Sequence, residues 1–146
     1  MKALVLYDSN FGNTKLIAEE IAKNLGDDVR LSSAKQFDGT DIDNIDLLVI
    51  GCPINGWRPT EAILAAINLL KSKLKDGLKY TTFDTRVKLF IHGDAKEYIS
   101  RILRNAGGKI VFEPQAFYVA GKKGPLYAGE IEKVAKWTTT ILSRMQ

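Results

Sequence analysis

Short apolar runs alternate with amphipathic segments along the sequence, and this alternation constrains the fold more than any other feature. The first run, residues 3–7, is continuously apolar, as in a strand that is buried on both faces of a sheet. The next segment, 13–25, carries apolar residues at helical spacing and ends before Gly26. Strands that alternate with helices through short connections form a parallel sheet with right-handed crossovers. The sequence therefore predicts an α/β fold with a parallel sheet and helices on both faces.

The other elements follow from the same two patterns. Further strands are predicted at 29–33, 47–50, 80–83 and 110–119, the last of them interrupted near Pro114. Further helices are predicted at 60–75, where Thr60 is suited to be the N-cap, at 95–106 and at 130–144. The segments 34–44 and 84–93 are predicted to be connections. The chain shows no linker, repeat or low-complexity tract, so residues 1–146 are expected to form one domain.

Composition narrows the function classes. Hydrophobic residues make up 45% of the 146 residues and charged residues 26%, which is typical of a soluble globular protein. Cys52 is the only cysteine and His92 the only histidine, so neither a disulfide within the chain nor a cysteine-cluster zinc site can form. The N-terminal apolar run is too short for a signal peptide, and no segment approaches a membrane span, which favours a cytoplasmic protein.

The net charge of +4 comes from lysines and arginines scattered along the chain. They form no block and no aromatic-interleaved motif, so nucleic-acid binding is not expected. Binding to a membrane is not expected either. Mild basicity is compatible with an anionic cofactor or an acidic protein partner.

The loop after the first strand is the first place to expect a ligand. In open parallel sheets ligands bind outside the carboxyl ends of the strands, where the winding direction switches. Residues 8–14 are rich in hydroxyls and amides and lead directly into a helix, whose N–H groups and dipole favour a phosphate. The Walker and dinucleotide-binding glycine patterns are absent from this loop. On local chemistry alone, its polar side chains could equally serve only to cap the helix.

The motif around this loop is more specific. The sequence from Val5 to Thr14, followed by Ala18 and Ile21, resembles the flavodoxin phosphate-loop signature at every constrained position. The resemblance extends over the whole chain in the order and length of its elements, and 83–86 and 124–130 are similar to a bacterial and archaeal branch of flavodoxin-like proteins. It implies a three-layer sandwich whose five-stranded parallel sheet has the order 2-1-3-4-5. It also implies a protein that binds FMN and transfers electrons between redox partner proteins.

The resemblance implies three groups of cofactor-binding residues. The FMN phosphate would lie on the first loop, at Ser9, Asn10, Gly12, Asn13 and Thr14, and Phe11 of the same loop would also contact the cofactor. One wall of the flavin ring would come from Pro53, Ile54, Asn55, Gly56 and Trp57. The pyrimidine edge and the other ring face would meet Asp84, Thr85, Arg86, Phe90, His92 and Gly93. Trp57 offers a broad face for stacking, although it could also be a surface tryptophan; Phe90 could belong to the core, and His92 could be a cap or surface residue.

Other functions fit the sequence less well than electron transfer. Cys52 and Arg58 have the C-x₅-R spacing of tyrosine phosphatases, but Pro53 lacks the amide such a loop needs. A receiver domain would need an aspartate after the third strand, where Gly51-Cys52 stands. An FMN-dependent oxidoreductase related to quinone reductases or protoporphyrinogen oxidase remains an alternative, as does a module that has lost FMN. A basic carrier is expected to meet redox partners with acidic docking faces.

Overall fold

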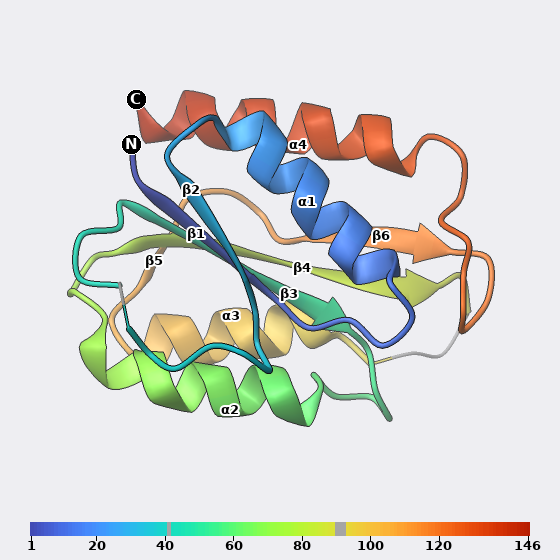
Figure 1. Cartoon of the computed structure of the whole chain (residues 1–146), viewed down its shortest axis with the longest axis horizontal. Helices are drawn as coiled ribbons and strands as arrows, with labels where there is room; N and C mark the ends of the chain where they lie inside the picture. Colours follow the sequence, from blue (N-terminus) through green and yellow to red (C-terminus); the bar gives the residue numbers. More distant parts are fainter. Residues whose placement is uncertain (41, 90–92) are drawn as a thin grey trace.

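One sheet of parallel strands runs through the middle of the computed structural model, which describes residues 1–40, 42–89 and 93–146 (Figure 1). The strands are β1 (Ala3–Tyr7), β2 (Val29–Ser33), β3 (Leu47–Pro53), β4 (Lys79–Val87), β5 (Lys109–Ile110) and β6 (Gln115–Val119). They lie in the order β2-β1-β3-β4, and both β5 and β6 pair with β4 on its remaining edge. The expected order 2-1-3-4-5 is therefore confirmed, with two short strands in the fifth position. The break between them includes Pro114, which has no N–H for the ladder.

Helices cover both faces of this sheet, which gives the three layers. They are α1 (Asn13–Leu25), α2 (Glu61–Leu70), α3 (Ala95–Asn105) and α4 (Glu130–Met145), with a short 3₁₀ turn at Lys71–Lys73. Figure 1 shows α1 and α4 on one face and α2 and α3 on the other. Each pair buries its apolar stripe against the sheet: Ile17 and Val134 lie in one core cluster, and Ile63 and Ile99 in the other.

Several predicted boundaries agree with the structure and others do not. The bounds of β1, α1 and β2 are as predicted, and Thr60 caps α2 by accepting a hydrogen bond from the Ile63 amide at 3.4 Å. The helix predicted over 60–75 ends earlier, and its last turn is the 3₁₀ turn. Both central strands are longer than predicted: β3 continues to Pro53 and β4 to Val87. The loop predicted from residue 84 is wrong for its first four residues, which belong to β4.

The carboxyl ends of the parallel strands meet at one edge of the sheet. In the register of the strands Tyr7 lies beside Gly51, Pro53 beside Thr85, and Val87 beside Val119. The loops that follow β1, β3, β4 and β6 therefore leave the sheet close together, on the side opposite the two chain termini (Figure 1). Within the described ranges no helix combines the length and the apolar character needed to cross a membrane.

Candidate functional site

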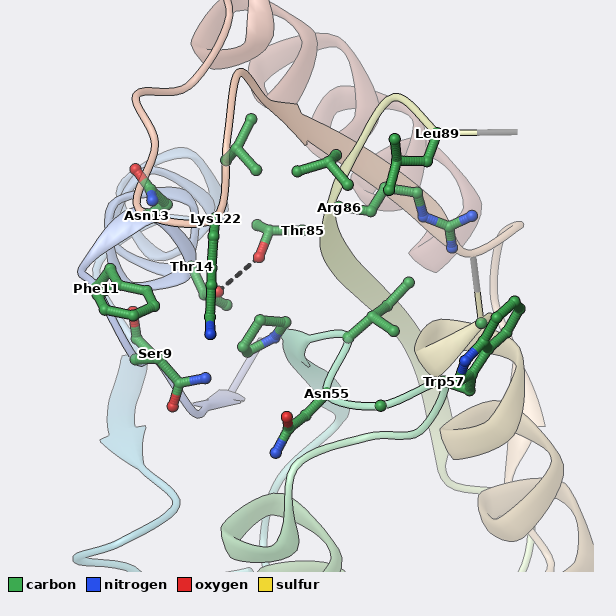
Figure 2. A pocket seen from close by; sticks show the side chains of 17 residues that line it. Ser9, Phe11, Asn13, Thr14, Asn55, Trp57, Thr85, Arg86, Leu89 and Lys122 are labelled. Carbon is green, nitrogen blue, oxygen red and sulfur yellow. Dashed lines mark hydrogen bonds between the residues drawn. The ribbon is translucent and has the colours of Figure 1, made fainter. Parts of the chain in front are cut away.

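A cavity of about 500 Å³ opens at the carboxyl edge of the sheet, where the loops after β1, β3, β4 and β6 converge (Figure 2). Its volume lies within the range typical of small-molecule sites. The lining residues are Ser9, Asn10, Phe11, Asn13, Thr14, Pro53, Ile54, Asn55, Gly56, Trp57, Thr85, Arg86, Val87, Leu89, Gly93, Val119 and Lys122. The structure therefore brings together most of the residues predicted from the three loops. Gly12 and Asp84 do not line the cavity, and Phe90 and His92 lie outside the described residues.

The first loop presents unused hydrogen-bond donors to one end of this cavity. In the part of the chain that the structure describes, the N–H groups of Asn10, Phe11, Asn13 and Thr14 donate to no protein acceptor. Two of them open helix α1, where the first N–H groups have no partner within the helix. Gly12 makes the tight turn possible because its φ of 97° lies in the left-handed region that favours glycine. The loop is thus a concave array of N–H dipoles suited to an anion.

Two hydroxyls add donors to the same end. Ser9 Oγ accepts hydrogen bonds from the Gly12 amide at 3.0 Å and the Lys15 amide at 3.3 Å, which leaves its own proton available to a ligand. Thr14 Oγ1 lies 2.7 Å from Thr85 Oγ1, and both threonines are buried. One of these two hydroxyls donates to the other, so one proton of the pair remains to be donated elsewhere. The contact also ties the start of α1 to strand β4 across the cavity floor.

A tight turn after β3 forms the other end of the cavity. Asn55 and Arg58 exchange two backbone hydrogen bonds of 2.7 and 3.1 Å, and the residues between them, Gly56 and Trp57, have φ values of 54° and 74°. Positive φ at both central positions is the pattern of a type I′ turn. Glycine adopts it freely, whereas a tryptophan held there is strained, and such strain is common at ligand sites. The Trp57 side chain is 59% exposed, so its ring is available to a ligand.

Gly93 supports this turn from behind. A Cβ atom built on Gly93 would lie 2.2 Å from the carbonyl oxygen of Trp57 and 2.4 Å from its Cα. Only glycine allows the two backbones to pack at this distance. The position of the turn therefore depends on a residue that lies 36 places further along the chain.

The carboxylate of Asp84 lies behind the cavity. It is fully buried and accepts hydrogen bonds from Arg86 Nε at 2.8 Å and from the Lys96 amide at 3.0 Å, the latter in the first turn of α3. Arg86 also contacts Asp94 at 3.0 Å, and Lys96 Nζ contacts the same carboxylate oxygen. Burial alone would lower the pKa of Arg86, but Asp84 and Asp94 outweigh it and hold that pKa above its usual value. Asp84 thus holds the Arg86 guanidinium and the start of α3 in place. Of these two residues, Arg86 lines the cavity and Asp84 does not.

Sequence reasoning missed four lining residues, and one of them is charged. Val87, Leu89 and Val119 are apolar residues at the ends of β4 and β6, and Lys122 lies beyond the last strand. The apolar residues could have been found by continuing the two strands to this edge of the sheet. The position of Lys122 could not be predicted, because no pattern in the sequence around it indicates that the chain returns to α1. Among the described residues that line the cavity, Arg86 and Lys122 are the ionisable ones, and none is a carboxylate.

Cys52 is in the core and away from the cavity. Its side chain is fully buried, and burial, with Asp84 and Asp8 nearby, raises the pKa of the thiol to about 12. A neutral, inaccessible thiol cannot serve as the nucleophile of a phosphatase. We expect Cys52 to react with Ellman's reagent in urea and not in the native protein, and Cys52→Ser to leave ligand binding unchanged. Rapid reaction of the native protein would contradict this assignment.

A family model agrees with the architecture described above. The model described as "Flavodoxin domain" matches residues 4–112, a span that begins at the second residue of β1, contains β2 to β5 and includes the cavity loops that follow β1, β3 and β4. No curated protein matches the sequence significantly.

Solved structures show the same fold at low sequence identity. A flavodoxin from the domain Archaea is 17% identical, with a TM-score of 0.81 and 99% of each chain covered. Oxidised flavodoxin 1 from Bacillus cereus is 15% identical, with a TM-score of 0.83 and 98% of each chain covered. Rubredoxin oxygen:oxidoreductase from Desulfovibrio gigas is 16% identical, with a TM-score of 0.82, and there the match covers 99% of this chain and 36% of the larger one. These likenesses establish the arrangement of the elements.

Proposed function

The chain belongs to the flavodoxin domain family, and from this premise we propose that it binds FMN in the cavity and carries single electrons between redox proteins. The observation that carries the proposal is the first loop, where four unused N–H groups and two hydroxyl groups converge on one end of the cavity. A terminal phosphate matches this donor set, because each of its oxygens accepts hydrogen bonds and its charge is favoured by the helix dipole.

The opposite end of the cavity suits the flavin ring. Trp57 presents an aromatic face, and Ile54, Val87 and Leu89 are apolar residues that line the same cavity. Figure 2 shows Ser9, Phe11 and Thr14 at one side of the cavity and Trp57 at the other, so the polar and aromatic parts of the site are separated. FMN has the same division between its phosphate and its ring. When bound, it would supply reversible one-electron transfer, for which this chain provides binding, orientation and shielding.

The direct test is whether the protein carries the cofactor. We expect the purified protein to be yellow and to release FMN on denaturation, and the apoprotein to quench FMN fluorescence on titration. Apoprotein that leaves FMN fluorescence unchanged would contradict the proposal.

Thr14→Ala tests the phosphate end of the site. The change removes a hydroxyl and leaves the buried Thr85 hydroxyl without its partner, so we expect the Kd for FMN to rise about 30-fold. Thr14→Ser is the matched control, since it keeps the hydroxyl and should stay within about threefold of the parent. Fluorescence quenching gives all three dissociation constants. Equal affinities for the alanine variant and the parent would exclude a phosphate at Thr14.

We propose a carrier in preference to an enzyme because of how the aromatic end meets solvent. Trp57 and Leu89 are 59% and 61% exposed while they line the cavity. A flavin against them would keep an edge accessible to another protein, which is what direct electron transfer between proteins needs. The alternative, an FMN-dependent oxidoreductase acting on a quinone or a porphyrinogen, predicts rapid bleaching of the flavin by NAD(P)H alone. We expect no such bleaching.

Basic residues around the cavity favour acidic partners. Lys88 Nζ lies 4.4 Å from the centre of the Tyr127 ring, and Arg58 packs on Tyr98. We expect the rate of reduction by a reductase with an acidic docking face to fall as ionic strength rises. The charge-reversal variant Lys88→Glu should reduce the rate and weaken its salt dependence. A rate independent of salt, measured by stopped flow, would contradict acidic docking.

A further inference from the structure

A hairpin that follows β6 reaches back over the start of α1. Beyond Val119 the chain turns and forms an antiparallel bridge between Val119 and Leu126, supported by a 2.8 Å hydrogen bond from the Ala120 amide to the Pro125 carbonyl. The tip is closed by a 2.9 Å hydrogen bond from the Gly124 amide to the Gly121 carbonyl. Lys122 and Lys123 are the two central residues of this turn, so backbone hydrogen bonds hold their Cα atoms in place.

The hairpin packs directly against the first loop. A Cβ atom on Gly124, whose φ is 102°, would lie 2.6 Å from Asn13 Oδ1, so the two segments are as close as glycine permits. Lys123 Nζ lies 5.9 Å from the centre of the Phe11 ring. Figure 2 shows the neighbouring side chain, Lys122, on the side of the cavity where Ser9, Phe11 and Thr14 lie, and Lys122 is one of the lining residues. The two lysines of one turn therefore have different surroundings, and Lys122 is the one that lines the cavity.

Lys122 also carries the charge of the cavity that is not neutralised. The other lining cation, Arg86, is held by Asp84 and Asp94. By contrast, Lys122 Nζ has no hydrogen bond, ion pair or aromatic ring as partner anywhere in ranges 1–40, 42–89 and 93–146. Because none of the described residues that line the cavity is a carboxylate, this long flexible ammonium side chain is placed to meet an anion.

We propose that Lys122 Nζ binds the terminal phosphate of the flavin cofactor and makes this chain select the phosphorylated flavin over riboflavin. The inference rests on the proposed function, since it names a ligand of the same cofactor. N–H groups and hydroxyls orient the phosphate through dipoles, whereas Lys122 supplies a full positive charge to a group that carries up to two negative ones. Because that charge is partly exposed, its contribution falls as salt screens it.

The test compares Lys122→Gln with Lys123→Gln, which removes the same charge from the same turn. For Lys122→Gln we expect the Kd for FMN at low salt to rise roughly tenfold and the Kd for riboflavin to stay within about twofold. For Lys123→Gln both constants should stay within about twofold of the parent. The FMN affinity of the parent should fall with salt more steeply than that of Lys122→Gln. Equal effects of the two variants, or an equal loss for FMN and riboflavin, would overturn the assignment.

Inorganic phosphate separates this inference from the proposed function. In the apoprotein we expect phosphate to shift the amide resonances of Asn13 and Thr14, at concentrations roughly tenfold higher for Lys122→Gln than for the parent. If the parent bound no FMN, the proposed function would fail, while this dependence on Lys122 would still support an anion contact. Amide shifts that are absent, or identical in parent and variant, would exclude Lys122 as a phosphate ligand.

Discussion

Gly93→Ala is expected to abolish tight FMN binding while the protein stays folded. The added Cβ would lie 2.2 Å from the Trp57 carbonyl oxygen, and the atoms in its way are backbone atoms that cannot rotate aside. The turn from Asn55 to Arg58 must then move, together with the strained conformation that it maintains at Trp57. Because the displaced turn carries Trp57 and lines the cavity, we expect the Kd for FMN to rise about 100-fold, a loss of about 2.7 kcal/mol of binding free energy. Fluorescence titration measures it.

Gly121→Ala is the matched control for this substitution. Gly121 precedes Lys122, which lines the cavity, but a Cβ on Gly121 would meet only the Gly124 carbonyl oxygen at 3.7 Å, an ordinary contact. We expect its FMN affinity to stay within about threefold of the parent. Urea unfolding of both variants separates a local change from a loss of the fold. An unchanged affinity in a folded Gly93→Ala protein would mean that the turn after β3 takes no part in holding the flavin.

The sequence was most informative where an element is either wholly apolar or regularly amphipathic. Strand β1 is apolar throughout and helix α1 has one apolar face, so hydrophobic periodicity alone located both. Strand β4 was predicted too short because Asp84 and Arg86 are charged, and a hydrophobicity pattern treats charge as a sign of exposure. Their burial depends on their pairing with each other, which is a property of the folded chain.

The candidate site was likewise predictable only in part. The loops after β1 and β3 follow strands that are clear in the sequence, and the rule that ligands bind at the carboxyl edge then located them. The hairpin that carries Lys122 could not be located in this way. It reaches α1 only because Gly124 packs against Asn13, and a contact between residues so far apart in sequence leaves no periodic signal.

Asp84→Asn is expected to destabilise the protein more than any exposed substitution. The carboxylate is fully buried, and the Arg86 side chain is 6% exposed, so removing the negative charge leaves a guanidinium without its main partner inside the protein. Breaking a buried pair from one side typically costs 3–5 kcal/mol, and we expect the free energy of unfolding to fall by about 3 kcal/mol. Because the second carboxylate, Asp94, still contacts Arg86, the expected loss is at the lower end of that range. Urea denaturation followed by circular dichroism measures it.

The double variant Asp84→Asn/Arg86→Met shows whether the charge pair is the cause. It removes both buried charges, while the asparagine oxygen can still accept the Lys96 amide at the start of α3. Since no unpaired charge is left inside, we expect the double variant to be more stable than Asp84→Asn, by about 1 kcal/mol or more. If the losses measured for Asp84→Asn and for a single Arg86→Met variant simply added in the double variant, the ion pair would contribute nothing of its own, and the length of β4 would need another explanation. Recovery in the double variant would show that the loss in Asp84→Asn comes from a buried Arg86 charge that has lost its main partner, because stability returns when that charge is removed as well.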